Sequence, residues 1–226
     1  MTNSVHTNAS ALIALQNLNA TNKNLASTQS RVNTGLKVQG AKDNAAVWAV
    51  AQNQRSDMKA LDSVKNSLNR ATSLADVSLA AGEQISDLLT QLQEKATAAA
   101  DPSATDATRK AYDDEFQALL ASITSFAANA AFDGENILNG TSTTPLAFLA
   151  NAGATETIPL NRQDLTLTGL GIDGLNLLDA TDATAALTAV KAGLATANAR
   201  LAELGAPSKQ IENHNNFVGK LMDSLE

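Results

Sequence analysis

Residues 32–52, VNTGLKVQGAKDNAAVWAVAQ, separate two long segments that both have helical patterning. Glycine adopts backbone conformations that are closed to other residues, so Gly35 and Gly40 allow the chain to bend between these segments. The stretch therefore predicts that an N-terminal helix, within residues 1–36, ends here. A short linker over residues 37–43 then leads into a second helix.

The second helix is expected to run from about Asn44 to Ala100. Either Asp43 or Asn44 can cap its start by accepting hydrogen bonds from free backbone N–H groups of the first turn. Trp48, the single tryptophan, would anchor this start against neighbouring residues, although the interpretation as an ordinary buried aromatic is slightly favoured. Such a helix would be roughly 85 Å long at 1.5 Å per residue. This length predicts a helical rod domain over residues 44–226.

Apolar residues recur in alternating steps of three and four in four segments, which begin at Ala11, Leu61, Tyr112 and Leu187. This is the period of a coiled coil, whereas a helix on a globular core more often has a wider apolar face. The fold class is therefore mainly α: a long helix, a return helix and a C-terminal helix packed as a rod. The residues expected to be buried in the rod or to support assembly are Leu18, Leu25, Val32, Trp48, Leu68, Leu89, Leu119, Ile123, Leu194 and Leu201.

The breaks between these segments have recognisable signals. Pro102 disfavours helical geometry before it and ends the second helix. Asp106 is expected to cap the third helix, and Asp179 or Asp182 the last one. Pro207 lies inside the last apolar pattern, where proline removes a backbone hydrogen bond and predicts a kink.

A small β region is expected over residues 132–178. The segment FDGENILN, residues 132–139, contains Asp-Gly, which is typical of a hairpin turn. Residues 165–168 alternate Leu and Thr, which predicts a short strand. The following GLGIDG, residues 169–174, matches a dinucleotide-binding pattern only in its letters. It lacks the required helix and acidic residue, so it predicts a turn between strands.

Composition narrows the function. Only 3% of the residues are aromatic although 44% are hydrophobic, which favours narrow helix–helix seams over a bulky core. The net charge of −7 argues against nucleic acid or an anionic membrane as a partner. There is no cysteine, no long apolar span and no basic start typical of a cleavable signal peptide. Both a cytosolic protein and one exported without a cleavable signal fit.

No pattern predicts catalysis, a cofactor or a metal. His6 and His214 lie in different segments without further ligands nearby in sequence. The acidic run from Asp113 to Glu115 lies near the start of a helix, where acids complement the helix dipole. We therefore interpret it as a solvated face.

The opening stretch resembles the junction between a terminal helix and the long helix of bacterial flagellins. The family pattern is approximately Ser-x-Gly-x-Arg-Ile-x-x-Ala-x-Asp-Asp-Ala-Ala-Gly. Near-substitutes stand at three positions, and Val47 replaces the last glycine. The positions that match are Gly35, Ala41, Asp43, Ala45 and Ala46.

Three more segments extend the resemblance. Residues 71–96 are similar to the second half of the flagellin long helix, and residues 130–140 to the turn after its return helix. Residues 204–226 resemble the C-terminal helix, especially in flagellins of alphaproteobacteria. The resemblance covers about residues 1–140 and 180–226.

The resemblance implies a structural subunit of an extracellular flagellar filament that is exported unfolded and without a cleavable signal peptide. It implies other flagellin subunits, an export chaperone and capping proteins as partners. It also implies contact with a Toll-like receptor through two positions. The arginine of many flagellins falls on Gln93, whereas Glu115 keeps the glutamate. A neutral amide cannot form the same charge-assisted pair, so weak receptor activation is expected.

The end of the chain departs from the family, whose members continue into a helix that pairs with the N-terminal one. This sequence stops at Glu226, which predicts an N-terminal arm that frays in the isolated chain and does not support polymerisation. Two alternatives remain at this point. One is a hook–filament junction protein, and the other is a chemoreceptor-like signalling coiled coil.

Overall fold

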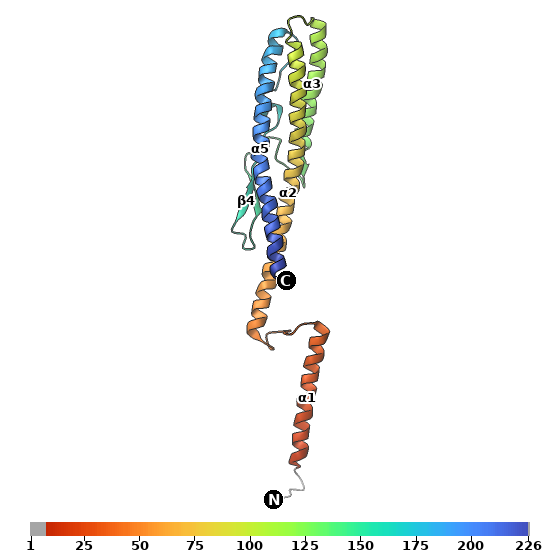
Figure 1. Cartoon of the computed structure of the whole chain (residues 1–226), viewed down its shortest axis with the longest axis vertical. Helices are drawn as coiled ribbons and strands as arrows, with labels where there is room; N and C mark the ends of the chain where they lie inside the picture. Colours follow the sequence, from red (N-terminus) through yellow and green to blue (C-terminus); the bar gives the residue numbers. More distant parts are fainter. Residues whose placement is uncertain (1–7, 226) are drawn as a thin grey trace. The chain divides into compact units, whose positions relative to one another are not determined.

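The computed structural model describes residues 8–225 (Figure 1). Expectations for residues 1–7, including His6, and for Glu226 lie outside this part. The chain divides into two compact units, one within residues 1–57 and the other within residues 58–226. The helices are α1 (Ala9–Thr34), α2 (Ala45–Ala99), α3 (Asp106–Asn129), α4 (Leu167–Leu170) and α5 (Ala180–Leu225). The strands are β1 (Ala131–Phe132), β2 (Glu135–Asn136), β3 (Leu146–Leu149) and β4 (Thr157–Leu160).

In the first unit, α1 and the start of α2 are separated by the predicted linker. Gly35 ends α1 with a φ of 67°, a left-handed conformation that suits glycine. Asn44 caps α2, because its Oδ1 accepts from the backbone N–H of Val47 at 3.1 Å. The alternative cap, Asp43, instead accepts from the backbone N–H of Gln39 at 3.0 Å and holds the linker in a turn.

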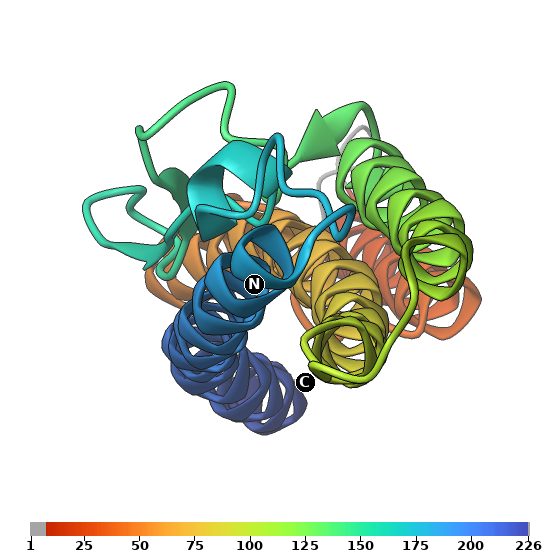
Figure 2. The ribbon, with the colours of Figure 1, turned by 90° about the horizontal axis from the view of Figure 1, so that it is seen from above.

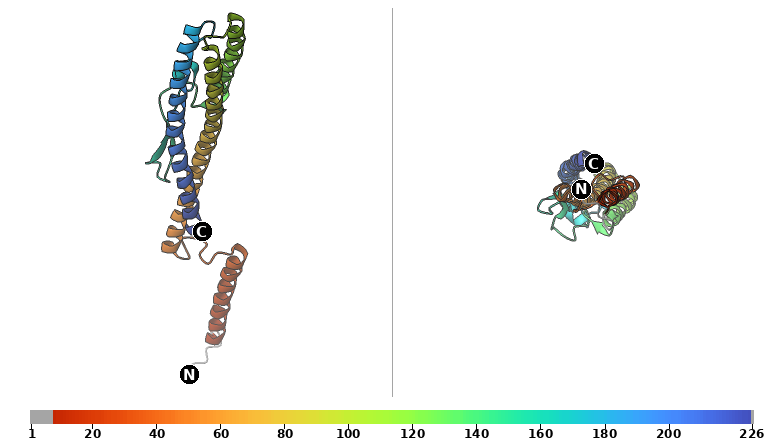
Figure 3. Two further views of the ribbon diagram at one scale, coloured as in Figure 1. Left: turned by 45° about the horizontal axis from the view of Figure 1, so that its top comes forward. Right: turned by 90° about the horizontal axis from the view of Figure 1, so that it is seen from below.

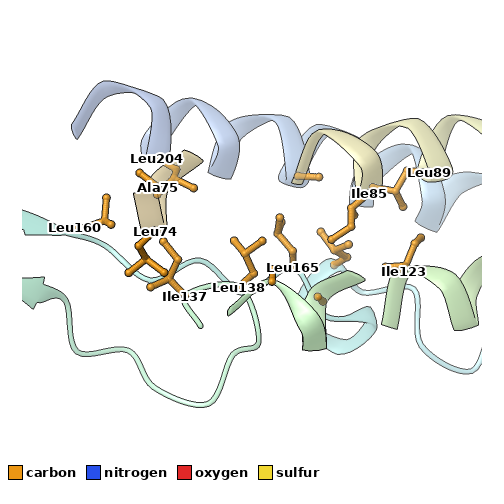
Figure 4. Packing of buried hydrophobic residues seen from close by; sticks show 14 of the residues in the cluster. Leu74, Ala75, Ile85, Leu89, Ile123, Ile137, Leu138, Leu160, Leu165 and Leu204 are labelled. Carbon is orange, nitrogen blue, oxygen red and sulfur yellow. The ribbon is translucent and has the colours of Figure 1, made fainter. Parts of the chain in front are cut away.

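The second unit is a bundle in which α2, α3 and α5 share one hydrophobic core (Figures 2 and 3). Leu68 and Leu89 of α2 and Ile123 of α3 are fully buried in it. Apolar side chains from the segment between α3 and α5 complete the core. Figure 4 shows three of them, Ile137, Leu138 and Leu165, beside the helices.

Half of the apolar stripe predicted for α3 is confirmed, because Phe116, Ile123 and Ala130 are buried, but the positions between them are shifted by one residue. Leu119 is half-buried and Leu120 is buried, and Phe126 is exposed while Ala127 is buried. The two leucines are adjacent, so each fits an apolar pattern with steps of three and four. The register is decided by two polar side chains that continue the buried line toward the start of the helix, as described below.

In α5, every seventh residue from Ala183 to Val218 is buried, as a coiled-coil period requires. The second expected line is different, because Leu194 and Leu201 are half-buried. In this part of α5 the buried positions are the small residues Gly193 and Ala197, and the two leucines beside them are partly exposed. α5 is continuous through Pro207, so the predicted kink does not interrupt the helix.

Two side-chain hydrogen bonds cross between α2 and α5. Ser86 Oγ donates to Asn198 Oδ1 at 3.0 Å, and Asn215 Nδ2 donates to Asn69 Oδ1 at 2.8 Å. The two donor–acceptor pairs are separated by the same number of residues along both helices, which run antiparallel. Both bonds therefore specify the same register.

The β region is smaller than expected. β1 and β2 form the predicted hairpin, and its Asp133-Gly134 turn has φ angles of 53° and 80°, as a type I′ turn requires. β3 and β4 form a second antiparallel pair. The strand predicted at residues 165–168 is wrong, because α4 begins there.

Helix-capping side chains explain why α4 forms where a strand was predicted, and they also correct the predicted start of α3. Thr166 Oγ1 accepts from the backbone N–H of Gly169 at 3.1 Å, and Gly171 ends α4 with a φ of 70°. At α3 the cap is Thr105, whose Oγ1 accepts from the N–H of Thr108, so the predicted cap Asp106 is the first helical residue. At α5, Asp179 caps as predicted.

Candidate assembly surfaces

The apolar stripe of α1 is exposed along its whole length. No described residue of α1 is buried, and Leu18, Leu25 and Val32 are 57%, 53% and 75% exposed. Leu12, Ile13 and Leu15 are exposed to a similar extent. An apolar stripe of this size on one helix is expected to pack against another surface, because most helix stability in proteins comes from packing an amphipathic face.

The first turns of α2 also expose apolar side chains within the first unit. Val47 and Val50 are 49% and 58% exposed. Trp48 lies between them and is half-buried, so it is not a core residue of the second unit. The apolar pattern in the sequence did not single out these two valines, because they precede Leu61, where the second pattern begins.

The second unit exposes two of its phenylalanines. Phe126 lies on α3, and Phe217 lies on α5 with its ring tilted against His214 at a centroid distance of 5.9 Å. The Nε2 atom of His214 is 2.6 Å from the carbonyl oxygen of Ala150, which ties α5 to the end of β3. This histidine therefore has a structural partner.

The two positions that resemble receptor contacts have different surroundings. Gln93 is half-buried on α2, and Glu115 is exposed on α3. Glu115 Oε2 forms an ion pair with Lys95 Nζ at 2.6 Å. The hydrogen bond from Lys95 to Glu115 raises the pKa of the lysine above its usual value of 10.5. The cation that faces Glu115 within the chain is thus Lys95.

The acidic run at the start of α3 is not uniformly solvated, which corrects the sequence interpretation. Asp113 is buried, and its Oδ1 accepts from the backbone N–H of Leu177 at 2.9 Å. Arg109 is also buried and donates to the carbonyl oxygens of Ala99 and Asp101, both at 3.0 Å. These two side chains join α3 to the end of α2 and to the segment before α5.

Within residues 8–225, the structure brings together no group of three or more His, Asp or Glu side chains that could hold a metal ion. Over the same residues, no helix is both long and apolar enough to cross a membrane.

A helical bundle together with a helix whose apolar stripe is exposed is typical of one class of protein. These are subunits that bury their remaining apolar surface when they assemble with other subunits. The family model of the bacterial flagellin N-terminal helical region matches residues 5–143. The chain belongs to the bacterial flagellin family.

Relatives with known names agree with this assignment. The chain is 46% identical to the flagellin FljM of Caulobacter vibrioides, and the match covers 99% of this chain and 82% of FljM. It is 35% identical to a flagellin of Brucella melitensis, with 99% and 82% coverage.

Two solved structures share the fold. The first is the crystal structure of Bacillus cereus flagellin, with a TM-score of 0.61, 23% identity, and coverage of 67% of this chain and 88% of that one. The second is a putative flagellar hook-associated protein from Vibrio parahaemolyticus, with a TM-score of 0.65, 14% identity, and coverage of 82% and 100%.

The family relationship gives the function. The chain is a structural subunit of the extracellular flagellar filament, and it polymerises with other flagellin subunits. This replaces the expectation from the sequence that the chain does not support polymerisation. The alternative of a hook–filament junction protein is not better supported, because the hook-associated likeness at 14% identity concerns the fold alone.

Proposed function

We propose that the α1 stripe is the surface through which this subunit packs into the core of the filament. In this proposal α1 is the filament-core helix, residues 37–43 are a spoke, and residues 44–226 form the rod domain. The observation that carries the proposal is the exposure of Leu18, Leu25 and Val32 along one helix that has no buried residue of its own.

The energetics support the same assignment. Burial of a leucine or valine side chain that is otherwise exposed contributes about 1.5–3 kcal/mol. Several such residues on one helix therefore supply a large driving force for association, whereas single exposed apolar residues are ordinary on protein surfaces. Heterologous contacts of this kind repeat without closing and build a filament.

The proposed function also includes export of the subunit. The chain crosses the export channel unfolded and without a cleavable signal peptide, with a chaperone before export and a capping protein at the growing end as partners. The absence of cysteine supports threading, because disulfide bonds would obstruct it. The role is structural, with no catalysis, and the net charge of −7 disfavours nucleic acid and anionic membrane as partners.

The receptor proposal rests on Gln93 and Glu115. A neutral amide at position 93 cannot supply the charged, bidentate donor of an arginine, and Glu115 is engaged by Lys95 within the chain. This flagellin therefore activates the Toll-like receptor weakly. A reporter-cell assay tests this, and a potency equal to that of an arginine-bearing flagellin contradicts it.

Paired charge substitutions in α1 test the assembly proposal. Leu25→Asp places a carboxylate in the apolar stripe, whereas Ser27→Asp places the same charge on the opposite side of the same helix. In cells with this protein as sole flagellin, Leu25→Asp is expected to abolish filaments and Ser27→Asp to retain them, as seen by electron microscopy. Filaments of normal length with Leu25→Asp, at normal export, contradict the proposal.

A further inference from the structure

The loop after β2 contains the Asn-Gly pair Asn139-Gly140. Asn139 is half-buried and Gly140 is exposed with a φ of 66°. In such a pair, the backbone nitrogen of the glycine can attack the side-chain carbonyl carbon of the asparagine, because glycine has no side chain to hinder the approach. This chemistry needs only water, and it does not depend on filament assembly.

We propose that Asn139 is a site of non-enzymatic deamidation, and that Thr141 controls its rate. The Gly140 nitrogen loses its proton and forms a bond to Cγ of Asn139. The Cγ–Nδ2 bond then breaks, and the Nδ2 nitrogen takes up a proton and leaves as ammonia. Water then opens the resulting five-membered succinimide, giving either aspartate or isoaspartate at position 139.

Two contacts of Asn139 oppose the reaction in the folded chain. Its Oδ1 accepts from the backbone N–H of Thr141 at 3.2 Å and from Thr141 Oγ1 at 2.8 Å. This is an Asx turn, and it fixes the rotamer of the side chain that must rotate toward the Gly140 nitrogen. The hydrogen bonds therefore keep the amide away from the reactive geometry.

A neighbouring charge adds to this protection. The carboxylate of Asp164 lies against Gly140, where a Cβ atom would be 2.7 Å from both of its oxygens. Its negative charge opposes the deprotonation of the Gly140 nitrogen that starts the reaction. The site combines a reactive pair with two features that slow it.

The product changes the local structure. Asn139 pairs with Asp164 in an isolated antiparallel bridge, next to the backbone bond from Leu165 N–H to Leu138 O at 2.9 Å. Aspartate at 139 brings a second negative charge to this bridge, and isoaspartate lengthens the backbone by one methylene group. Both products weaken the pairing between the segments around Asn139 and Asp164. Deamidation therefore accumulates with the age of a subunit that is not replaced.

The chain supplies its own internal control. Asn151 is also half-buried, and its Oδ1 also accepts from a threonine, through the backbone N–H of Thr155 at 3.0 Å. The next residue is Ala152 instead of glycine. Asn151 Nδ2 also donates to Thr155 Oγ1 at 2.8 Å. The two asparagines therefore compare a reactive Asn-Gly pair with an Asn-Ala pair whose side chain is also held by hydrogen bonds.

The test is peptide mapping by mass spectrometry of the full chain, incubated at neutral and mildly alkaline pH, folded and in urea. Asn139 is expected to deamidate faster than Asn151 in the folded chain, and faster still in urea. Thr141→Ala should accelerate the folded reaction about fivefold, the effect of one ordinary hydrogen bond. Thr141→Ser should retain the slow rate, since serine offers the same two donors.

Circular dichroism establishes that each variant remains folded. The proposal is overturned if Asn139 in the folded chain converts no faster than Asn151. It is also overturned if Thr141→Ala and Thr141→Ser deamidate at equal rates, or if folded and unfolded chains do.

Discussion

The packing of α2 against α5 at Gly82 leads to a prediction in which one substitution changes sign between two backgrounds. Gly82 is buried in the middle of α2, and a Cβ atom there would collide with the Cδ2 atom of Leu201 and lie 3.3 Å from Leu165 Cδ1. Leu201 thus fills the space that the missing side chain leaves. Glycine at position 82 thus matters for packing and not for backbone conformation, and a larger residue there requires the Leu201 side chain to shift.

The magnitude follows from two opposing terms. Alanine is more favourable than glycine in a helix interior by about 0.8–1.0 kcal/mol. Overpacking of a filled core costs about 1–3 kcal/mol. Gly82→Ala should therefore destabilise the protein by about 0–2 kcal/mol. In a Leu201→Ala background the collision is absent, and the same substitution should stabilise by about 1 kcal/mol.

Urea unfolding followed by circular dichroism measures all four free energies of this double-mutant cycle. Gly219→Ala is the matched control, because Gly219 lies inside α5 and a Cβ atom added there would meet no heavy atom within 4 Å. It should stabilise both backgrounds equally. If Gly82→Ala stabilises by the same amount with and without Leu201, the close approach of α2 and α5 at this point is refuted.

Three further predictions test other parts of the structure. Trypsin should cleave first after the exposed Lys37 or Lys42 of the linker and leave a resistant fragment that contains the bundle; cleavage that begins inside the bundle contradicts this. Asp113→Ala should lower the free energy of unfolding by about 1–3 kcal/mol because it leaves the Leu177 N–H without its partner. Asp114→Ala, at an exposed position, should change it by less than about 0.5 kcal/mol, and equal effects would contradict the difference in burial. Glu115→Gln should lower the raised pKa of Lys95 in an NMR titration, and an unchanged pKa argues against the ion pair. Folding raises the pKa of Lys95. The ion pair therefore contributes fully to the free energy of unfolding at neutral pH, and this contribution is lost as the pH rises through the pKa of Lys95 in the folded chain.

Much of the fold is predictable from the sequence because the apolar period is sustained over long segments. The bounds of α2 and the Asp133-Gly134 turn follow from a cap, a proline and a dipeptide with specific backbone requirements. The strand expected at residues 165–168 shows the limit of such patterns. Alternating Leu and Thr fits a strand, but Thr166 is also a good cap, and the cap determined the structure.

The apolar residues of α3 predict one half of its buried stripe, Phe116, Ile123 and Ala130, but not the other half. Leu119 and Leu120 are equivalent in a hydrophobic pattern, and the buried line includes Arg109 and Asp113, which such a pattern leaves out. Their burial depends on backbone partners in α2 and before α5, and these partners are distant in sequence. The apolar stripe of α1 was predictable for the opposite reason, since it depends on one helix and its periodicity.

Cysteine labelling tests most directly whether α1 packs between subunits in the filament. The chain has no cysteine, so a single Leu25→Cys substitution gives a label without background. In the monomer the residue is 53% exposed, and a maleimide reagent should react with it rapidly. In intact filaments it should be protected, and reactivity should return after the filaments are dissociated. Equal reactivity in monomer and filament would contradict the account.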